Sequence, residues 1–131
     1  MSRAPSGMLM EPMVILVSDN VLLISRITNH LCQLNYRVMD LRDPHMLPAA
    51  VREQQPMFVL LDLDLRNHDA VPALAQLKSD AGLKHTLVLA FAHRANEPLL
   101  EEARGGGADL VTTSEAVASH LSPLVDQLLG V

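Results

Sequence analysis

One stretch decides the fold: Pro56-Met57-Phe58-Val59-Leu60-Leu61-Asp62-Leu63-Asp64-Leu65. Apolar residues run without a break directly into Asp62. An apolar run of this length without alternation predicts a strand buried on both faces, as in the middle of a parallel sheet. Such a strand delivers the Asp62 carboxylate to the carboxyl edge of the sheet, where open α/β sheets hold their ligands. Because an unpaired buried charge is costly, core packing gives no reason for an acid there, and Asp62 indicates a site.

Four further strands are predicted, over residues 13–17, 36–40, 86–91 and 109–112. Helical spacing and capping residues between and after the strands predict five helices, over residues 21–34, 46–53, 70–77, 97–104 and 117–128. Strands that alternate with helices in this way call for right-handed crossovers. The predicted fold is therefore α/β: a (βα)5, doubly wound, five-stranded parallel sheet with helices on both faces.

Several polar residues are expected to end or begin these helices. Asn35 suits the left-handed conformation after the first helix. Asp69 and Asn96 are expected to cap the third and fourth helices. We interpret residues 1–12 as a flexible N-terminal extension and residues 13–131 as one domain, since no linker to a second domain is evident.

Composition excludes several classes of function. A formal net charge of -5 argues against a nucleic-acid partner, which would need a basic surface. No apolar run approaches the ~20 residues that span a bilayer, so no membrane association is expected. Cys32 is the only cysteine, which excludes an intrachain disulfide and favours a reducing, cytoplasmic location. Its place in an apolar helical pattern predicts a buried structural thiol.

Two of the predicted strands, the first and the third, end in acids, Asp19 and Asp62. In a doubly wound sheet of five strands these two strands lie side by side, so we expect the carboxylates to be neighbours. Close carboxylates repel each other and raise a pKa or recruit a cation. Mg²⁺ suits such oxygen ligands and commonly binds carboxylates together with phosphate oxygens. A carboxylate beside that ion could attack phosphorus to give an aspartyl-phosphate.

The chain resembles a response-regulator receiver domain (CheY-like, with the flavodoxin-like receiver fold) from about residue 13 to residue 129. The resemblance rests on 14–20, on 59–63, on 87–93 where the fourth strand ends, and on Gly107-Ala108-Asp109 before the fifth strand. It implies that Asp62 accepts phosphate from a histidine kinase or phosphotransfer protein of a two-component phosphorelay. It also implies that Asp19, Asp62 and the backbone carbonyl of Asp64 hold Mg²⁺. Such a domain is no enzyme beyond its own phosphorylation and dephosphorylation at Asp62.

The chain departs from the family pattern at the positions that respond to phosphorylation. Ser18 replaces the first acid of the metal-binding pair, so the Mg²⁺ site is weakened. Phe91 stands where the fourth strand carries Ser or Thr, and Val111 where the fifth carries an aromatic residue. Ser114 replaces the Lys that pairs with the phosphoryl group. We hypothesise an atypical, degenerate receiver that signals mainly through its surface and independently of phosphorylation.

Other charged residues bear on that hypothesis. Glu115 takes the place of the proline that follows the family's Lys, and Arg66 that of the proline four residues beyond the acceptor. Arg66 is a candidate substitute for the missing cation. His93 lies near the predicted site and is the only histidine that merits attention there.

Alternatives stay open for individual residues and for the whole chain. Asp19 could be the N-cap of the first helix, and Ser114 that of the last. The chain could be an interaction module without phosphate chemistry, or a homodimer through the face formed by the fourth helix, fifth strand and fifth helix. Asp62-Leu63-Asp64 also resembles the nucleophile motif of haloacid-dehalogenase-like phosphatases, although the residues after it leave little room for the remaining catalytic parts of such an enzyme.

Overall fold

The computed structural model describes residues 12–66 and 68–130 of the chain. The expected N-terminal extension, residues 1–12, therefore lies outside the described residues except for Pro12. The main-chain carbonyl of Pro12 accepts a hydrogen bond of 2.8 Å from the N–H of Arg37. This bond joins the start of the first strand to the start of the second.

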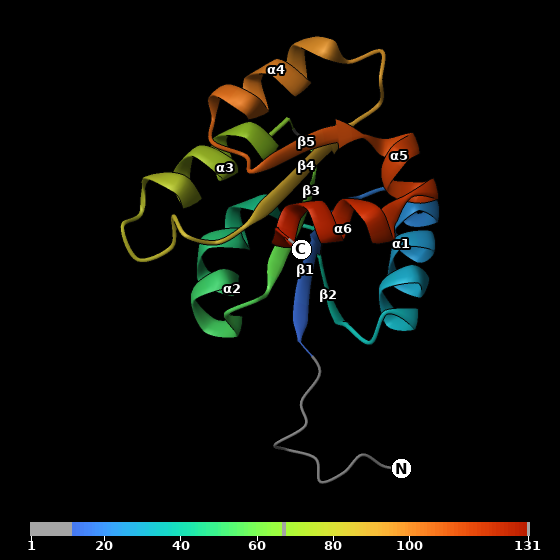
Figure 1. Ribbon diagram of the computed structural model, residues 1–131. Helices are drawn as coiled ribbons and strands as arrows, with labels where there is room; N and C mark the ends of the chain where they lie inside the picture. The colour runs from blue at the N-terminus through green and yellow to red at the C-terminus, as the bar shows by residue number, and fades with distance from the viewer. Residues whose placement is uncertain (1–11, 67, 131) are drawn as a thin grey trace, which may run out of the picture.

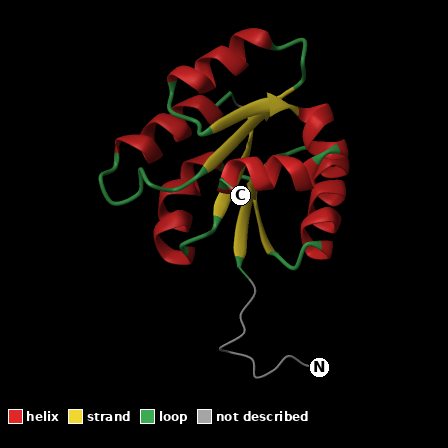
Figure 2. Cartoon of the chain, in the orientation of Figure 1, coloured by secondary structure: helices red, strands yellow, loops and turns green. Residues whose placement is uncertain are grey.

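The centre of the molecule is one sheet of five parallel strands, seen in Figures 1 and 2. The strands are β1 (Met13–Val17), β2 (Arg37–Leu41), β3 (Phe58–Asp62), β4 (Val88–Ala92) and β5 (Leu110–Thr113). Their order across the sheet is β2-β1-β3-β4-β5. The predicted α/β fold with a doubly wound parallel sheet is confirmed, and β1 and β3 are neighbours, as the pairing of Leu16 with Leu60 shows.

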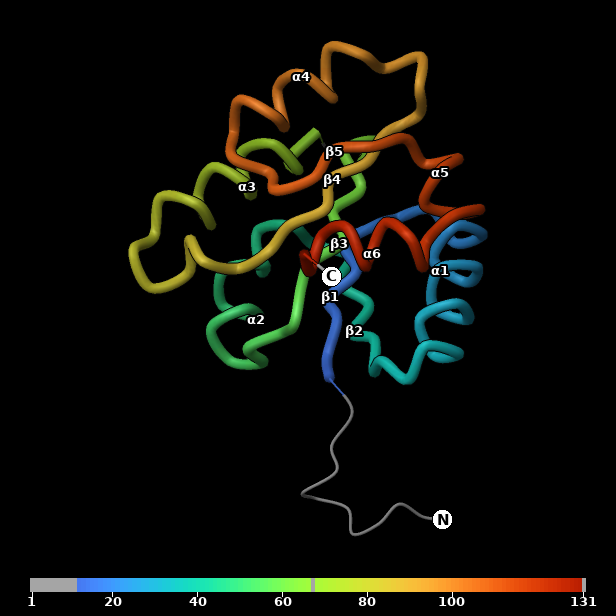
Figure 3. Tube along the Cα trace, viewed as in Figure 1, coloured from blue at the N-terminus to red at the C-terminus, as the bar shows by residue number. Residues whose placement is uncertain are grey.

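Helices cover both faces of the sheet (Figure 3). They are α1 (Val21–Gln33), the short 3₁₀ helix η2 (Pro44–Met46), α2 (Leu47–Gln54), α3 (Ala70–Ser79), α4 (Glu97–Gly105), α5 (Ser114–Ser119) and α6 (Leu121–Leu129). Helices α2, α3 and α4 pack on one face, and α1, α5 and α6 on the other. Among the described residues, no helix has the length and apolar character needed to cross a membrane.

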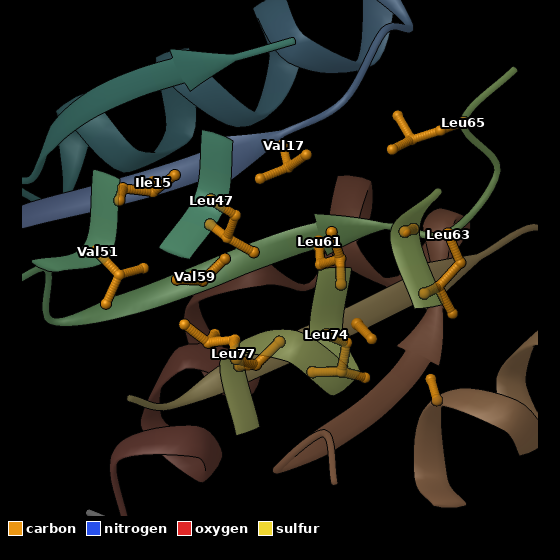
Figure 4. Close-up of a cluster of buried hydrophobic side chains, with 14 of the residues drawn as sticks. Ile15, Val17, Leu47, Val51, Val59, Leu61, Leu63, Leu65, Leu74 and Leu77 are labelled. Atoms are coloured by element: carbon orange, nitrogen blue, oxygen red, sulfur yellow. The ribbon is translucent and has the colours of Figure 1, made fainter. Parts of the chain in front are cut away.

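The continuous apolar run of β3 is explained by burial on both sides. Val59 and Leu61 pack in the cluster under α2 and α3, which Figure 4 shows in close-up. Phe58 and Leu60 point to the opposite face and pack with α1 and α6. Successive side chains of a strand alternate between faces, so a central strand has no solvent side on which to place polar residues.

The single final helix predicted over residues 117–128 is wrong, because two helices, α5 and α6, meet at His120. Pro123 lies in the first turn of α6 and has no N–H to donate. Its ring would also clash with the carbonyl of Ser119, four residues earlier, in a continuous helix. The chain avoids that clash by ending α5 and starting a new helix.

Of three other local predictions, one is confirmed and two are wrong. Asn35 adopts the expected left-handed backbone, with φ of 69°. Asp69 holds the N-cap position of α3, but its side chain caps nothing there and its Oδ2 lies 2.8 Å from Nε2 of His45. The prediction of a buried Cys32 is wrong, because the thiol is exposed. Leu31 faces the core, and the next residue on a helix is turned about 100° away from it.

Candidate functional site

A pocket of about 710 Å³ opens at the carboxyl edge of the sheet. Its walls come from the first turns of α1, from the start of α5 and from the loops that follow β1, β3 and β4. Asp19, Asp62 and Asp64 all line it. The expectation that strands one and three bring two acids to one edge therefore agrees with the geometry.

Asp62 lies at the bottom of this pocket and is only 3% exposed. Its Oδ2 accepts a hydrogen bond of 2.7 Å from the hydroxyl of Ser18, which is itself fully buried. Its Oδ1 accepts one of 2.9 Å from the main-chain N–H of Asp64. Both carboxylate oxygens thus have protein donors, which reduces the cost of burying the charge.

Burial raises the pKa of the Asp62 carboxyl above its ordinary value. The hydrogen bonds from Ser18 and from the Asp64 N–H oppose that rise by stabilising the charged form, whereas the nearby negative charges of Asp64 and Asp19 add to it. Two other acids are therefore close enough to act on Asp62 electrostatically.

Asp19 is left to the pocket because another residue caps α1. The N-cap is Asn20, whose Oδ1 accepts a hydrogen bond of 3.1 Å from the N–H of Leu23. The N–H of Arg66 donates 3.0 Å to Oδ2 of Asp19, so the loop after β3 is tied to the loop after β1. The alternative that Asp19 itself caps the first helix is wrong.

Asp64 faces the loop that leads from β4 into α4. Its Oδ2 accepts a hydrogen bond of 2.7 Å from the main-chain N–H of His93, and its Oδ1 accepts one of 2.6 Å from Nδ2 of Asn96. Asn96 occupies the N-cap position of α4 but makes no capping bond with its side chain. The expected capping role of Asn96 is thus replaced by a contact across the pocket edge.

His93 connects the same loop to α5. Its Nε2 lies 3.2 Å from Oε2 of Glu115. Its Nδ1 accepts a hydrogen bond of 3.1 Å from the N–H of Ala95, which leaves Nε2 as the donor to the carboxylate in the neutral ring. The sequence offers no sign of the pairings made by Asn96 and Glu115, because each joins segments that lie far apart in the chain.

The positions predicted to form a degenerate switch lie in different surroundings. Phe91 pairs with Asp62 across β3 and β4, is fully buried on the α1, α5 and α6 side of the sheet, and is not among the residues that line the pocket. Val111 is partly buried against the opposite cluster. Ser114 lines the pocket. It does not cap α5 as expected, since the hydroxyl of Thr113 accepts from the N–H of Ala116.

The pocket offers two cations, Arg26 and Arg66, besides its acids. Over residues 12–66 and 68–130, no group of three or more His, Cys, Asp or Glu side chains is arranged to hold a metal ion. The carboxylate oxygens that could bind a cation at the pocket floor come from Asp19 and Asp62, and the buried hydroxyl of Ser18 donates to Asp62 from behind the lining residues.

No protein-family model matches the sequence, and a search of curated proteins finds no match either. Solved structures do match. The phosphorylated cyanobacterial phytochrome response regulator RcpA is 26% identical with a TM-score of 0.71, over 92% of this chain and 90% of its own.

Two further solved structures resemble the chain at lower identity. One is the receiver domain of the sensor histidine kinase PA1611 from Pseudomonas aeruginosa PAO1, with magnesium in its active-site cleft; it is 19% identical with a TM-score of 0.81, over 92% of this chain and 99% of its own. The other is the receiver domain of NtrX from Brucella abortus, 19% identical with a TM-score of 0.78, over 89% of this chain and 98% of its own.

Proposed function

We propose that this chain, whose fold is that of response-regulator receiver domains, is a signalling module of a two-component system that works largely without phosphorylation. Asp62 is its candidate phosphoacceptor. The observation that carries the proposal is the state of that residue: the carboxylate is 3% exposed, and both of its oxygens already accept hydrogen bonds, from Ser18 and from the Asp64 N–H. An Asp62 oxygen can attack phosphorus only after it loses one of these hydrogen bonds, so we expect phosphotransfer to be slow.

The position of Asp62 still suits an acceptor. It ends the central strand β3 and lies at the floor of the pocket, where a phosphodonor can enter between α1 and the loop after β4. An Asp62 oxygen would attack the phosphorus, and the bond from phosphorus to the leaving atom of the donor would break: an imidazole nitrogen in a phosphohistidine, an oxygen in an acyl phosphate. The donor would be a histidine kinase, a phosphotransfer protein or a small acyl phosphate.

Mg²⁺ fits the donor chemistry of the pocket floor, though weakly. Asp19, Asp62 and the main-chain carbonyl of Asp64 supply the hard oxygens that this ion prefers. When bound, the ion would offset negative charge as a phosphoryl group moves. Ser18 brings a hydroxyl instead of a charge, and its donated hydrogen bond already satisfies Oδ2 of Asp62, so we expect low affinity.

The substitutions impair the conformational response to phosphorylation more than the transfer of phosphate to Asp62. The family's hydroxyl and Lys have no counterpart in Phe91, which is committed to the core, or in Ser114, which is neutral. Arg66 is the proposed substitute cation, because it lines the pocket and its main-chain N–H is fixed to Asp19.

We therefore assign the output to the surface of the domain. The proposed binding face is formed by α4, β5 and α5, through which the chain would contact a partner or a second copy of itself. The proposal includes a cytoplasmic location, no nucleic-acid partner, and no enzymatic activity beyond phosphorylation and dephosphorylation at Asp62.

Labelling with acetyl phosphate, followed by intact mass, tests the proposal. With and without Mg²⁺, we expect slow, substoichiometric addition of one phosphoryl group to the wild type and none to Asp62→Asn. Rapid stoichiometric labelling would contradict phosphorylation independence. Turnover of a chromogenic phosphate ester would instead favour the dehalogenase-like phosphatase alternative, which relies on Asp62 and Asp64.

A further inference from the structure

The loop of residues 93–96, which joins β4 to α4, is held from two sides (Figure 1 shows it running from the end of β4 to α4). On one side lies Asp64, and on the other Glu115 at the start of α5. We propose that Asp64 is a positioning residue, whose carboxylate fixes this loop, and with it the start of α4, in one arrangement without any phosphoryl group.

The contacts of Asp64 carry the argument. Each of its two carboxylate oxygens accepts one hydrogen bond from the loop, Oδ2 from the His93 N–H at 2.7 Å and Oδ1 from Nδ2 of Asn96 at 2.6 Å. Hydrogen bonds to a charged acceptor are shorter and stronger than neutral ones. Asp64 is only partly exposed, so water competes less well for its oxygens than on an open surface.

The use made of Asn96 supports a positioning role. Asparagine is among the best N-cap residues, and capping stabilises a helix. Asn96 holds the N-cap position of α4 and yet directs its amide to Asp64. The start of α4 is therefore anchored to the loop after β3, and the negative charge of Asp64 near that helix terminus is favourable for the helix dipole.

The anchoring extends to the acceptor and to α5. The main-chain N–H of Asp64 donates to Oδ1 of Asp62, so the residue that holds the loop also contacts the acceptor. The His93 ring continues the chain of contacts to Glu115. Acceptor, loop, α4 and α5 are thus linked without the hydroxyl and Lys that Phe91 and Ser114 replace.

The inference deepens the proposed function, on which it rests in one respect: that the face of α4, β5 and α5 is the one that signals. Asp64 would keep that face in its binding arrangement at all times. Amide hydrogen exchange measures the loop directly and needs neither Mg²⁺ nor a phosphodonor. Its outcome is therefore separate from that of acetyl-phosphate labelling.

The test compares the full chain with its Asp64→Ala variant by amide exchange and by NMR of the Asn96 side-chain amide. We expect the His93 amide to exchange at least about tenfold faster in the variant, as loss of a charge-assisted hydrogen bond implies. The Asn96 amide resonances should move to the positions of a solvated side chain. The amides of Val59 and Leu89, in the central strands, should keep their protection.

Two further variants make the outcome decisive. Asp64→Asn keeps one acceptor oxygen and presents an NH₂ to the other donor, so it should loosen the loop to an intermediate extent. The control is Asp109→Ala, which removes a carboxylate that accepts from the N–H of Val88 and from Nζ of Lys78; it should expose Val88 and leave His93 protected. Unchanged exchange at His93 and an unchanged Asn96 amide in both Asp64 variants would overturn the proposal.

Discussion

The hydroxyl of Ser18 donates a 2.7 Å hydrogen bond to Oδ2 of Asp62, and both residues are buried. Ser18 also accepts a hydrogen bond of 3.1 Å from the N–H of Asn20. The position that matches the first acid of the receiver family's metal-binding pair is therefore filled by a neutral hydrogen-bond donor. The Asp62 carboxylate is stabilised by hydrogen bonds from the protein. An acid at position 18 would instead repel it unless a cation were bound between them.

Replacing Ser18 by Ala should lower the free energy of unfolding. The variant leaves Oδ2 of buried Asp62 without its donor, which costs about 1–3 kcal/mol. Urea denaturation at pH 7 measures the loss. Ser25→Ala, an exposed serine on α1, is the control and should change stability by no more than about 0.5 kcal/mol. Equal stability of Ser18→Ala and wild type would contradict the role of this bond.

Replacing Ser18 by Asp should strengthen Mg²⁺ binding by about tenfold or more, because affinity for hard cations rises with the number of carboxylate ligands. Isothermal titration calorimetry measures the dissociation constants. Ser18→Asn, of similar shape but neutral, should bind no better than wild type. If both variants bind alike, the missing charge is not what limits the site.

Asp62→Asn should stabilise the protein at neutral pH. The Asn amide can donate to the Ser18 hydroxyl and accept from the Asp64 N–H, so the packing is kept while the buried charge is removed. The pKa of Asp62 is raised by burial, so the folded state binds the proton more tightly than the unfolded chain does. The wild type therefore loses stability as the pH rises through that raised pKa.

The pH dependence provides the check on that substitution. Below the pKa of an unfolded aspartate, about 3.9, both forms of residue 62 are neutral and the advantage of Asp62→Asn should vanish. Thermal unfolding of the two proteins from pH 3 to pH 8 gives the difference curve. An advantage that stays constant over this range would mean that charge burial is not its cause.

Phe91→Thr should destabilise the domain without improving phosphorylation. Phe91 is fully buried against α1, α5 and α6, and truncating a buried Phe costs about 3–5 kcal/mol. The new hydroxyl would lie on the strand next to Asp62, in register with it, but it adds no positive charge that could attract a phosphodonor. Urea denaturation and acetyl-phosphate labelling of the same sample measure both effects, and faster labelling would place residue 91 in the site after all.

Arg66→Ala should slow labelling of Asp62 by acetyl phosphate several-fold, because it removes a cation that lines the pocket next to Asp19. Rate constants from intact mass spectra give the comparison. Arg94→Ala, an exposed arginine on the loop after β4 that is outside the pocket lining, should label like the wild type. A rate unaffected by Arg66→Ala would leave the family's Lys without a substitute.

The order of elements was predictable because it depends on patterns within short windows. The apolar runs that end in Asp19 and Asp62 mark buried parallel strands, and the register of β1 and β3 brings those ends together. Apolar spacing does not predict the break at His120, because the spacing continues smoothly across it. Only Pro123 indicates the break. Proline breaks a helix in its interior but is tolerated in a first turn, so its presence alone does not decide where a helix begins.

Contacts between loops were not predictable. Nothing local connects Asp64 with Asn96, or His93 with Glu115, because both pairings depend on how the carboxyl ends of different strands meet. Each of these residues has an ordinary local explanation, such as capping a helix or standing in solvent. The sequence also does not decide which of two adjacent hydroxyl residues caps a helix. Thr113 caps α5, whereas the prediction is Ser114.

Asn20 caps α1 and Asp19 lines the pocket, so the two roles can be separated by mutation. Because the first turn of α1 is secured by the amide of Asn20, exchange of the Asp19 carboxylate for a neutral group subtracts charge from the cavity and leaves the helix start intact. In a cell, a defect caused by such an Asp19 substitution would therefore reflect lost chemistry in the pocket. A defect caused by an Asn20 substitution would instead reflect a less stable and less abundant protein.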